Sequence, residues 1–274
     1  MQFRDNIATR RWRADRTTRM TRTTDMDSAI LPPSQPLRCI SSMATRQWLA
    51  ALCERWTRDG GGAVELESVG GVDAANRIAA GEDFDVAVLA ADALDRLAAA
   101  GHVGPLTGLA VSQVAIAAPA GRAPPVATVA ELRRTLGACR AIGYSTGPSG
   151  KALLALLARW DLLDALRERL VQAPPGVPVG ELLARGTVDL GFQQHSELIH
   201  CQGIALLGPM PPGAEIPTLF AGATCQASAR ASRAAALVAY LAGASGADVI
   251  RAEGMEPALA APPAPRPIFP DRLS

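Results

Sequence analysis

Short apolar strands alternate with amphipathic helical segments along most of this chain, and this alternation limits the fold more than any single motif does. Strand-like runs occur at residues 37–40, 63–67, 84–90, 111–118 and 188–192. Most of these runs are followed by a segment in which apolar residues recur at the spacing of one helix face. Such βαβ spacing predicts an α/β fold with mostly parallel sheets and helices on both faces.

The alternation exceeds what one small sheet needs, and 274 residues are enough for two lobes of ordinary size. We therefore expect two α/β lobes with a ligand cleft between them. Lobe I would contain residues 37–112 plus 215–257, and lobe II residues 113–214. Residues 1–36 hold seven arginines and predict a disordered basic leader. Residues 258–274, rich in Pro and Ala, predict an extended tail.

Composition excludes several classes of function. The chain has 27 basic and 26 acidic residues and is only 4% aromatic, which argues against a nucleic-acid partner. No stretch approaches the roughly 18 apolar residues that span a bilayer, so a membrane-spanning protein is not expected. The first residues lack the apolar core of a secretory signal, which predicts a cytoplasmic location for the chain as written.

The five cysteines are scattered, without a CxxC pair or a histidine at metal-ligand spacing. They are expected to be small buried apolar residues. We expect neither a metal nor a cofactor.

Polar or glycine-rich loops follow four of the predicted strands. Parallel sheets bind ligands beyond the carboxyl ends of their strands, so these loops predict one shared site. The candidate ligand-binding residues are Ser41, Ser42, Ser68, Gly70, Ser145, Thr146, Gly147, Ser149, Gly150, Gln193, Gln194 and Ser196.

The turn at residues 143–150 is the strongest of these signals, because it lies between a short strand and a helix. Backbone N–H groups and hydroxyls at a helix N-terminus stabilise an anion without any lysine or arginine. The turn is not a phosphate-binding P-loop, because Lys151 is followed by Ala152 and not by Ser or Thr. The alternative is an ordinary helix start whose hydroxyls bond only their own backbone. Thr128 is predicted to cap another helix, over residues 129–136.

His195 is the only histidine near a predicted loop, and a lone histidine is more often a surface or core residue than a catalytic one. Glu197 would repel an anion and is expected to point away from the cleft or to cap the following turn. Ser, His195 and Asp189 could form a triad, but no GxSxG motif accompanies them, so hydrolase chemistry is not expected.

The order of these motifs resembles the molybdate-binding-protein-like family of type II periplasmic solute-binding proteins, which are receptors of ABC transporters. The resemblance covers roughly residues 37–257. It rests on Ser41-Ser42, the turn Ser68 to Gly71, the run Ile78 to Val86, the turn Gly143 to Gly150, the segment Val188 to Gln194, and the closing motif Gly254-Met255-Glu256-Pro257.

The resemblance implies two α/β lobes that close on a ligand by hinge motion. It implies binding of a tetrahedral oxyanion by serine hydroxyls and backbone amides, and an ABC permease as a partner. Carried over by position, the binding residues are Ser42, Ser68, the turn Ser145 to Gly150, and Gln194 or Ser196 from lobe II.

Two functions stay open from the sequence. The first is a solute-binding protein that captures a small oxyanion or organic acid and catalyses nothing. The second follows from a divergent branch of the family that is similar to aconitate isomerase, which moves a proton along an unsaturated tricarboxylate. That chemistry needs a base, and His195, or else Glu197, could serve. A ligand-sensing domain is a third alternative.

Overall fold

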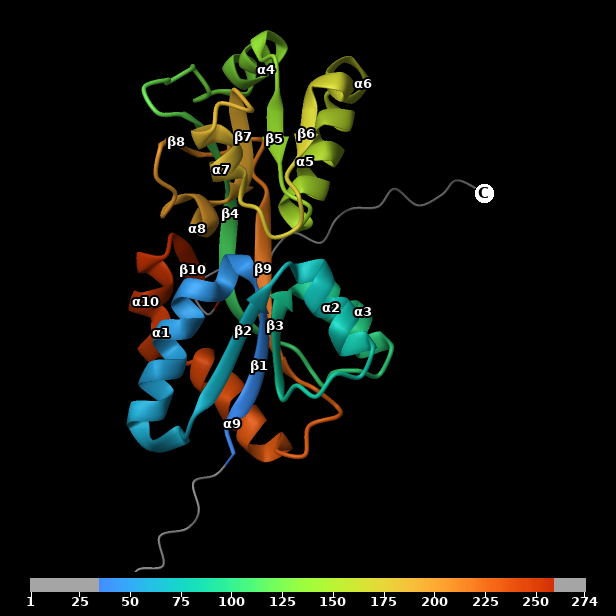
Figure 1. Ribbon diagram of the computed structural model, residues 1–274, viewed down its shortest axis with the longest axis vertical. Coiled ribbons are helices and arrows are strands. Elements are labelled where there is room, and N and C mark those ends of the chain that lie inside the picture. The colour runs from blue at the N-terminus through green and yellow to red at the C-terminus, as the bar shows by residue number, and fades with distance from the viewer. Residues whose placement is uncertain (1–34, 259–274) are drawn as a thin grey trace, which may run out of the picture. The chain divides into compact units, whose positions relative to one another are not determined.

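The computed structural model describes residues 35–258, and it confirms the predicted α/β class with helices on both faces of its sheets (Figure 1). The predicted leader and tail lie outside the described residues, apart from residues 35, 36 and 258. The strands are β1 (Leu37–Ser42), β2 (Val64–Val69), β3 (Val86–Ala90), β4 (Thr107–Pro119), β5 (Ile142–Tyr144), β6 (Leu170–Gln172), β7 (Leu190–Gln194), β8 (Ile204–Pro209), β9 (Pro217–Thr224) and β10 (Met255–Pro257).

Helices follow most of these strands. They are η1 (Met43–Thr45), α1 (Arg46–Trp56), η2 (Thr57–Gly61), α2 (Gly71–Ala79), α3 (Ala91–Ala99), α4 (Val129–Ala138), α5 (Pro148–Arg159), α6 (Leu163–Leu166), η3 (Arg167–Arg169), α7 (Val179–Ala184), α8 (His195–Leu198), α9 (Ala231–Leu241), η4 (Ala244–Gly246) and α10 (Ala247–Ala252). Thr128 caps α4 as predicted, because its hydroxyl accepts a hydrogen bond from the Glu131 N–H at 3.2 Å.

The strands are ordered β2-β1-β3-β9-β4-β7-β5-β6, and β8 and β10 pair with β4 off this path. β1 is parallel to β2 and β3, and β5 is parallel to β6 and β7. The expectation of mostly parallel sheets is met in these two groups but not between them, where β4 and β9 run antiparallel to their neighbours. β4 carries the chain from lobe I to lobe II, and β9 carries it back (Figure 1). Each of these two strands therefore runs antiparallel to the strands beside it.

Each lobe has apolar cores on both faces of its sheet. In lobe I, α1 and α9 cover one face around Trp48 and Leu237, and α2 and α3 cover the other around Phe84. In lobe II, α4 and α5 pack around Phe192, while α7 and α8 pack around Val179. The cores account for the apolar periodicity of the sequence, whereas the exact boundaries proposed for the lobes stay a prediction.

Four of the five cysteines are buried as expected. All five are free thiols, and Cys39, Cys53, Cys139 and Cys225 are buried, whereas Cys201 is half-buried, contrary to the expectation. Burial raises the pKa of Cys53 to about 12 and that of Cys139 to about 11, so these thiols stay protonated and unreactive at neutral pH.

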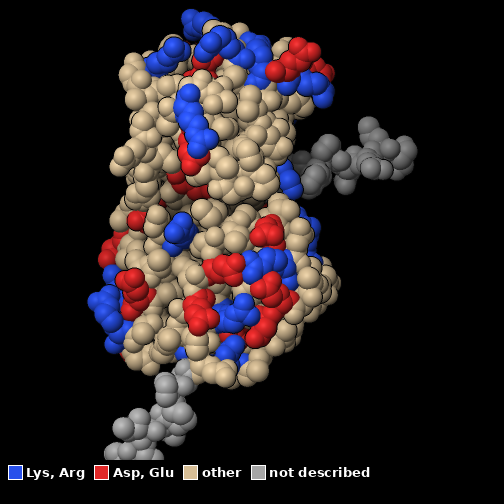
Figure 2. Space-filling view, viewed as in Figure 1, with Lys and Arg blue, Asp and Glu red and all other residues tan. Residues whose placement is uncertain are grey.

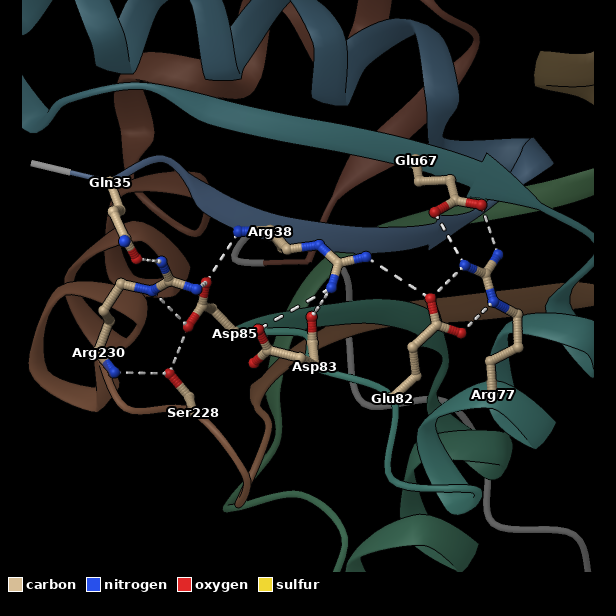
Figure 3. A network of polar contacts seen from close by, with 9 residues as sticks. All are labelled: Gln35, Arg38, Glu67, Arg77, Glu82, Asp83, Asp85, Ser228 and Arg230. Carbon is tan, nitrogen blue, oxygen red and sulfur yellow. Dashed lines mark hydrogen bonds and ion pairs between the residues drawn. The ribbon is translucent and has the colours of Figure 1, made fainter.

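A polar network extends from the amino ends of β1 and β3 to Glu67 in the carboxyl half of β2 (Figure 3). Its centre is Asp85, which is fully buried just before β3 and pairs with Arg230 at 3.0 Å. Beside it, the guanidinium groups of Arg38 and Arg77 lie 4.8 and 5.2 Å from the centre of the Phe84 ring. Around Asp85, this network ties β1, β3 and the start of α9 together at the end of the sheet that is remote from the predicted cleft.

Charged side chains are unevenly placed on the surface. Figure 2 shows Arg side chains gathered, beside some Asp and Glu, over the α4 and α6 end of lobe II and mixed with Asp and Glu over lobe I, with fewer charges in the band between. Within residues 35–258, no single helix has the length and apolar character needed to cross a membrane. Only α9 and the segment 244–252, bent by 58° at a break, pass that test as a pair.

Candidate functional site

A pocket of about 290 Å³ lies between the two lobes, at the carboxyl ends of their parallel strands. It is lined by residues that follow β1, β2 and β3 in lobe I and β5, β6 and β7 in lobe II. This is where open α/β sheets bind ligands. Of the predicted binding residues, the structure brings to this pocket Ser42, Gly70, Ser145, Thr146, Gly147, Ser149, Gln193 and Gln194.

The lobe I wall combines helix N-termini with one orphaned hydroxyl. The first residues of α2 and α3, including Gly71 and Asp92, line the pocket and bring the positive ends of two helices to it. Ser42 precedes η1 but makes no side-chain cap, and its Oγ is buried without a hydrogen-bond partner among the described residues. A buried hydroxyl without a hydrogen bond destabilises the fold unless a ligand or a water molecule supplies that bond.

The lobe II wall contains the turn that the sequence singled out. Gly147 is the N-cap of α5, and Pro148 is its first residue. The Ser145 and Ser149 hydroxyls lie 2.8 Å apart and bond each other, not the helix backbone as the alternative interpretation required. The free N–H groups at the start of α5, with these hydroxyls, form a neutral cradle for an anion.

Gln193 and Gln194 lie on β7. The sequence predicted a loop after this strand for both residues. The strand is extended because β4 is long enough to pair with it out to Gln194, opposite Val114. Gln194 is buried, donates from Nε2 to the Thr218 hydroxyl at 2.7 Å, and leaves Oε1 unpaired within the described part of the chain. Because a hydroxyl donates as well as accepts, turning the amide over would present an N–H group in place of that oxygen.

Glu197 lines the pocket, so the expectation that it points away is wrong. It lies on α8, one turn after Gln193, whose Nε2 donates to its Oε1 at 2.8 Å. Burial raises the pKa of Glu197 to about 7, although the hydrogen bond from Gln193 acts in the opposite direction. A carboxyl with such a pKa is partly protonated at neutral pH and therefore repels an anion less than an ordinary glutamate would.

The other predicted residues lie behind or beside the pocket. The Ser41 and Ser68 hydroxyls bond each other at 2.8 Å across β1 and β2. The Ser196 hydroxyl donates to the Ala44 carbonyl at 2.9 Å. Gly150 packs inside the 145–150 turn, where a Cβ atom would come within 1.8 Å of the Ser145 carbonyl oxygen. His195 is not among the lining residues, and its Nδ1 lies 3.1 Å from the Gly254 carbonyl oxygen.

Sequence reasoning missed two cations at this pocket, Arg96 on α3 and Lys151 on α5. Arg96 is paired with Asp92 at 3.2 Å. Lys151 is exposed and has no ion pair with any other described residue. The sequence did carry a signal, because Lys151 is the only lysine in an arginine-rich chain and directly follows the turn at residues 143–150.

Residues 37–256 match the model of a family described as bacterial extracellular solute-binding protein. The chain belongs to this family. One relative, aconitate isomerase from a Pseudomonas species, is 34% identical to this chain over 190 residues. The aligned residues cover 68% of this chain and 72% of the relative. The family and the predicted resemblance agree.

Two solved structures show the same fold. The periplasmic molybdate-binding protein of Azotobacter vinelandii superposes with a TM-score of 0.67 at 21% identity, over 80% of this chain and 98% of that one. The sulfate-binding protein SubI of Mycobacterium tuberculosis gives a TM-score of 0.67 at 16% identity, over 82% and 87%. At such identities these likenesses establish the type II periplasmic-binding-protein fold and nothing finer.

Proposed function

We propose that this solute-binding protein captures a small organic polycarboxylate in the pocket between its lobes. The observation that carries the proposal is the composition of the pocket wall, in which neutral donors are joined by Lys151, a cation without an ion pair among residues 35–258. A charge-assisted hydrogen bond is worth about 1.5–3 kcal/mol, so a few donors and one ammonium group hold a dianion or trianion firmly.

The size of the pocket favours an organic acid over a single tetrahedral oxyanion. A volume of about 290 Å³ is many times the roughly 10–15 Å³ that one water molecule needs, and it is more than one compact oxyanion fills. The similarity to aconitate isomerase also supports a tricarboxylate. Capture of molybdate or sulfate is the alternative, and an ABC permease stays a predicted partner.

A thermal-shift series with trans-aconitate, citrate, molybdate and sulfate tests the proposal. A ligand at about 100 times its Kd stabilises the folded state by about 2.7 kcal/mol, which raises Tm by several degrees. We expect this shift with a tricarboxylate. A shift of Tm with molybdate or sulfate alone would indicate that the protein captures an oxyanion. No shift with any of the four compounds would contradict both polycarboxylate capture and oxyanion capture.

Lys151→Met is expected to weaken tricarboxylate binding about tenfold or more, because one charge-assisted contact is lost. The measurement is calorimetric titration at low ionic strength, where the effect is largest. Arg159→Met is the matched control, since Arg159 is an exposed cation on the same helix that does not line the pocket. Equal affinities of the two variants would show that Lys151 does not contact the ligand.

Isomerisation of the bound acid is a second candidate function, favoured by the 34% identity to aconitate isomerase. Incubation with cis-aconitate, followed by NMR detection of the trans isomer, tests it directly. Binding without turnover would leave the protein a receptor.

A further inference from the structure

Glu197 lines the pocket without an ion pair to any cation of residues 35–258. Asp92 is paired with Arg96, and Lys151, on α5 in the same lobe as α8, forms no ion pair with Glu197. The Glu197 carboxyl receives one hydrogen bond, from Gln193 to Oε1, and Oε2 has no partner within residues 35–258. A carboxyl in this state is poised to exchange a proton with whatever occupies the pocket.

The carboxyl is also held in place. The Gln193 amide cannot turn over, because its Oε1 accepts a hydrogen bond from the Val179 N–H at 2.7 Å and its Nε2 is thereby directed at Glu197. On its other side α8 is anchored to lobe I by the Ser196 contact with Ala44 and the His195 contact with Gly254. Fixed geometry of this kind is what a proton-transfer step requires.

We propose that Glu197 is the group that moves a proton within the bound ligand, taking it from a carbon next to a carboxylate and returning it elsewhere on the same molecule. This inference rests on the proposed binding of an unsaturated polycarboxylate. In the step, the C–H bond of a methylene carbon breaks, its proton passes to the Glu197 carboxylate, and its electron pair forms a new carbon–carbon π bond. The old π pair then takes the proton at the far carbon, so no oxidant, reductant or leaving group is needed.

The rest of the pocket suits this step. Negative charge develops on the ligand carboxylate next to the reacting carbon, and the Ser145 and Ser149 hydroxyls, the start of α5 and Lys151 are donors that would stabilise it. A base acts best when its pKa is near the working pH, and burial gives Glu197 such a value, about 7. Lys151 and the Asp92–Arg96 pair are the other charged groups that line the pocket, and the Cys201 Sγ donates to the Glu197 carbonyl oxygen at 3.1 Å.

The test uses the full chain with trans-aconitate in D2O, and NMR follows both the loss of the methylene proton signals and the appearance of the cis isomer. Wild-type protein is expected to exchange these protons. Glu197→Gln, which keeps the size and the Gln193 contact, is expected to exchange them at least about a hundredfold more slowly. Its affinity in the thermal-shift assay should stay within severalfold of wild type. Glu181→Gln is the matched control, because Glu181 is exposed on α7, paired with Arg185 and outside the pocket.

Each outcome decides the inference. Exchange at the wild-type rate in Glu197→Gln would overturn it, and loss of exchange in His195→Ala with retention in Glu197→Gln would reassign the role to His195. Binding of trans-aconitate by wild type with neither exchange nor conversion to the cis isomer would refute the inference and leave the proposed capture intact, whereas absence of binding would refute the capture itself. If Glu197→Gln does not fold, Glu197→Asp, with its carboxylate withdrawn by one methylene, is expected to slow exchange at least tenfold, and an unchanged rate would count against Glu197.

Discussion

Replacing Asp85 by alanine is expected to lower the free energy of unfolding by about 3 kcal/mol. The Asp85 carboxylate is fully buried and accepts hydrogen bonds from the Ser228 hydroxyl at 2.6 Å and the Arg38 N–H at 2.8 Å. It also neutralises the Arg230 guanidinium at 3.0 Å (Figure 3). The substitution leaves a half-buried cation and two donors without their acceptor, and each of these is costly.

Urea denaturation measures this loss, and Asp83→Ala is its control. Asp83 lies two residues earlier in the same loop, but its side chain is 67% exposed and its ion pair with Arg38 spans 4.0 Å. Exposed pairs of this kind contribute at most about 1 kcal/mol. Equal destabilisation of the two variants would contradict a central role for Asp85.

The same carboxylate gives the stability a defined pH dependence. Burial acts to raise the pKa of Asp85, but the hydrogen bonds from Ser228 and Arg38 and the Arg230 charge outweigh it, so the pKa lies below the usual value. A group with a depressed folded pKa stabilises the protein above the unfolded value, about 3.9, and this stabilisation is lost as the pH falls through the folded value. We therefore expect wild type to lose more stability than Asp85→Ala does over this acidic range.

Gly150→Ala is expected to destabilise the protein by about 1–3 kcal/mol and to abolish ligand-induced stabilisation. The new Cβ would lie 1.8 Å from the Ser145 carbonyl oxygen and 2.9 Å from its carbonyl carbon, and neither is a flexible side-chain atom that could move aside. The turn must open, which displaces Ser145 and Ser149 from the pocket wall. Thermal unfolding with and without trans-aconitate measures both effects.

Gly147→Ala is the control for the stability part of that prediction. It lies in the same turn, and the nearest atom to a new Cβ there would be the Ser145 Oγ at 3.7 Å, an ordinary contact. Its stability should stay within about 0.5 kcal/mol of wild type. Equal losses in the two variants would show that the close approach at Gly150 is not what limits the turn.

The local features of the fold could be predicted from the sequence because they depend on neighbouring residues. The Thr128 cap follows from side chains three residues apart. Ser42, Gly70 and Ser145 reach one pocket because each follows a parallel strand, and parallel strands end at the same edge. Such spacing is visible in one sequence.

Features that depend on distant pairing could not be predicted. The antiparallel course of β4 and β9 requires pairing between residues more than 100 positions apart, for example Ser112 with Thr218. The same long strand β4 draws Gln193 and Gln194 into β7. No local sequence pattern indicates the pairing of β4 with β9 or with β7.

The sequence offered Glu197 only as an alternative to His195 for the proposed proton transfer, for a related reason. From sequence, a histidine is the natural candidate for proton transfer near neutral pH, because its ordinary pKa lies there. Burial by residues from several elements raises the pKa of the Glu197 carboxyl to the same range. Burial of this kind depends on the tertiary structure and is not visible in the sequence. His195, by contrast, is directed to the Gly254 carbonyl.

The central claim is that a small polycarboxylate binds between the lobes, and the single lysine permits a direct measurement. Reductive methylation with ¹³C-formaldehyde labels Lys151 and the chain's α-amino group and retains the positive charge. Lys151→Arg identifies the lysine signal in the NMR spectrum by its loss. Titration with trans-aconitate is expected to shift this signal saturably, with the midpoint seen in calorimetry. A tricarboxylate that stabilises the protein while the Lys151 signal stays unchanged would place the ligand elsewhere and contradict the claim.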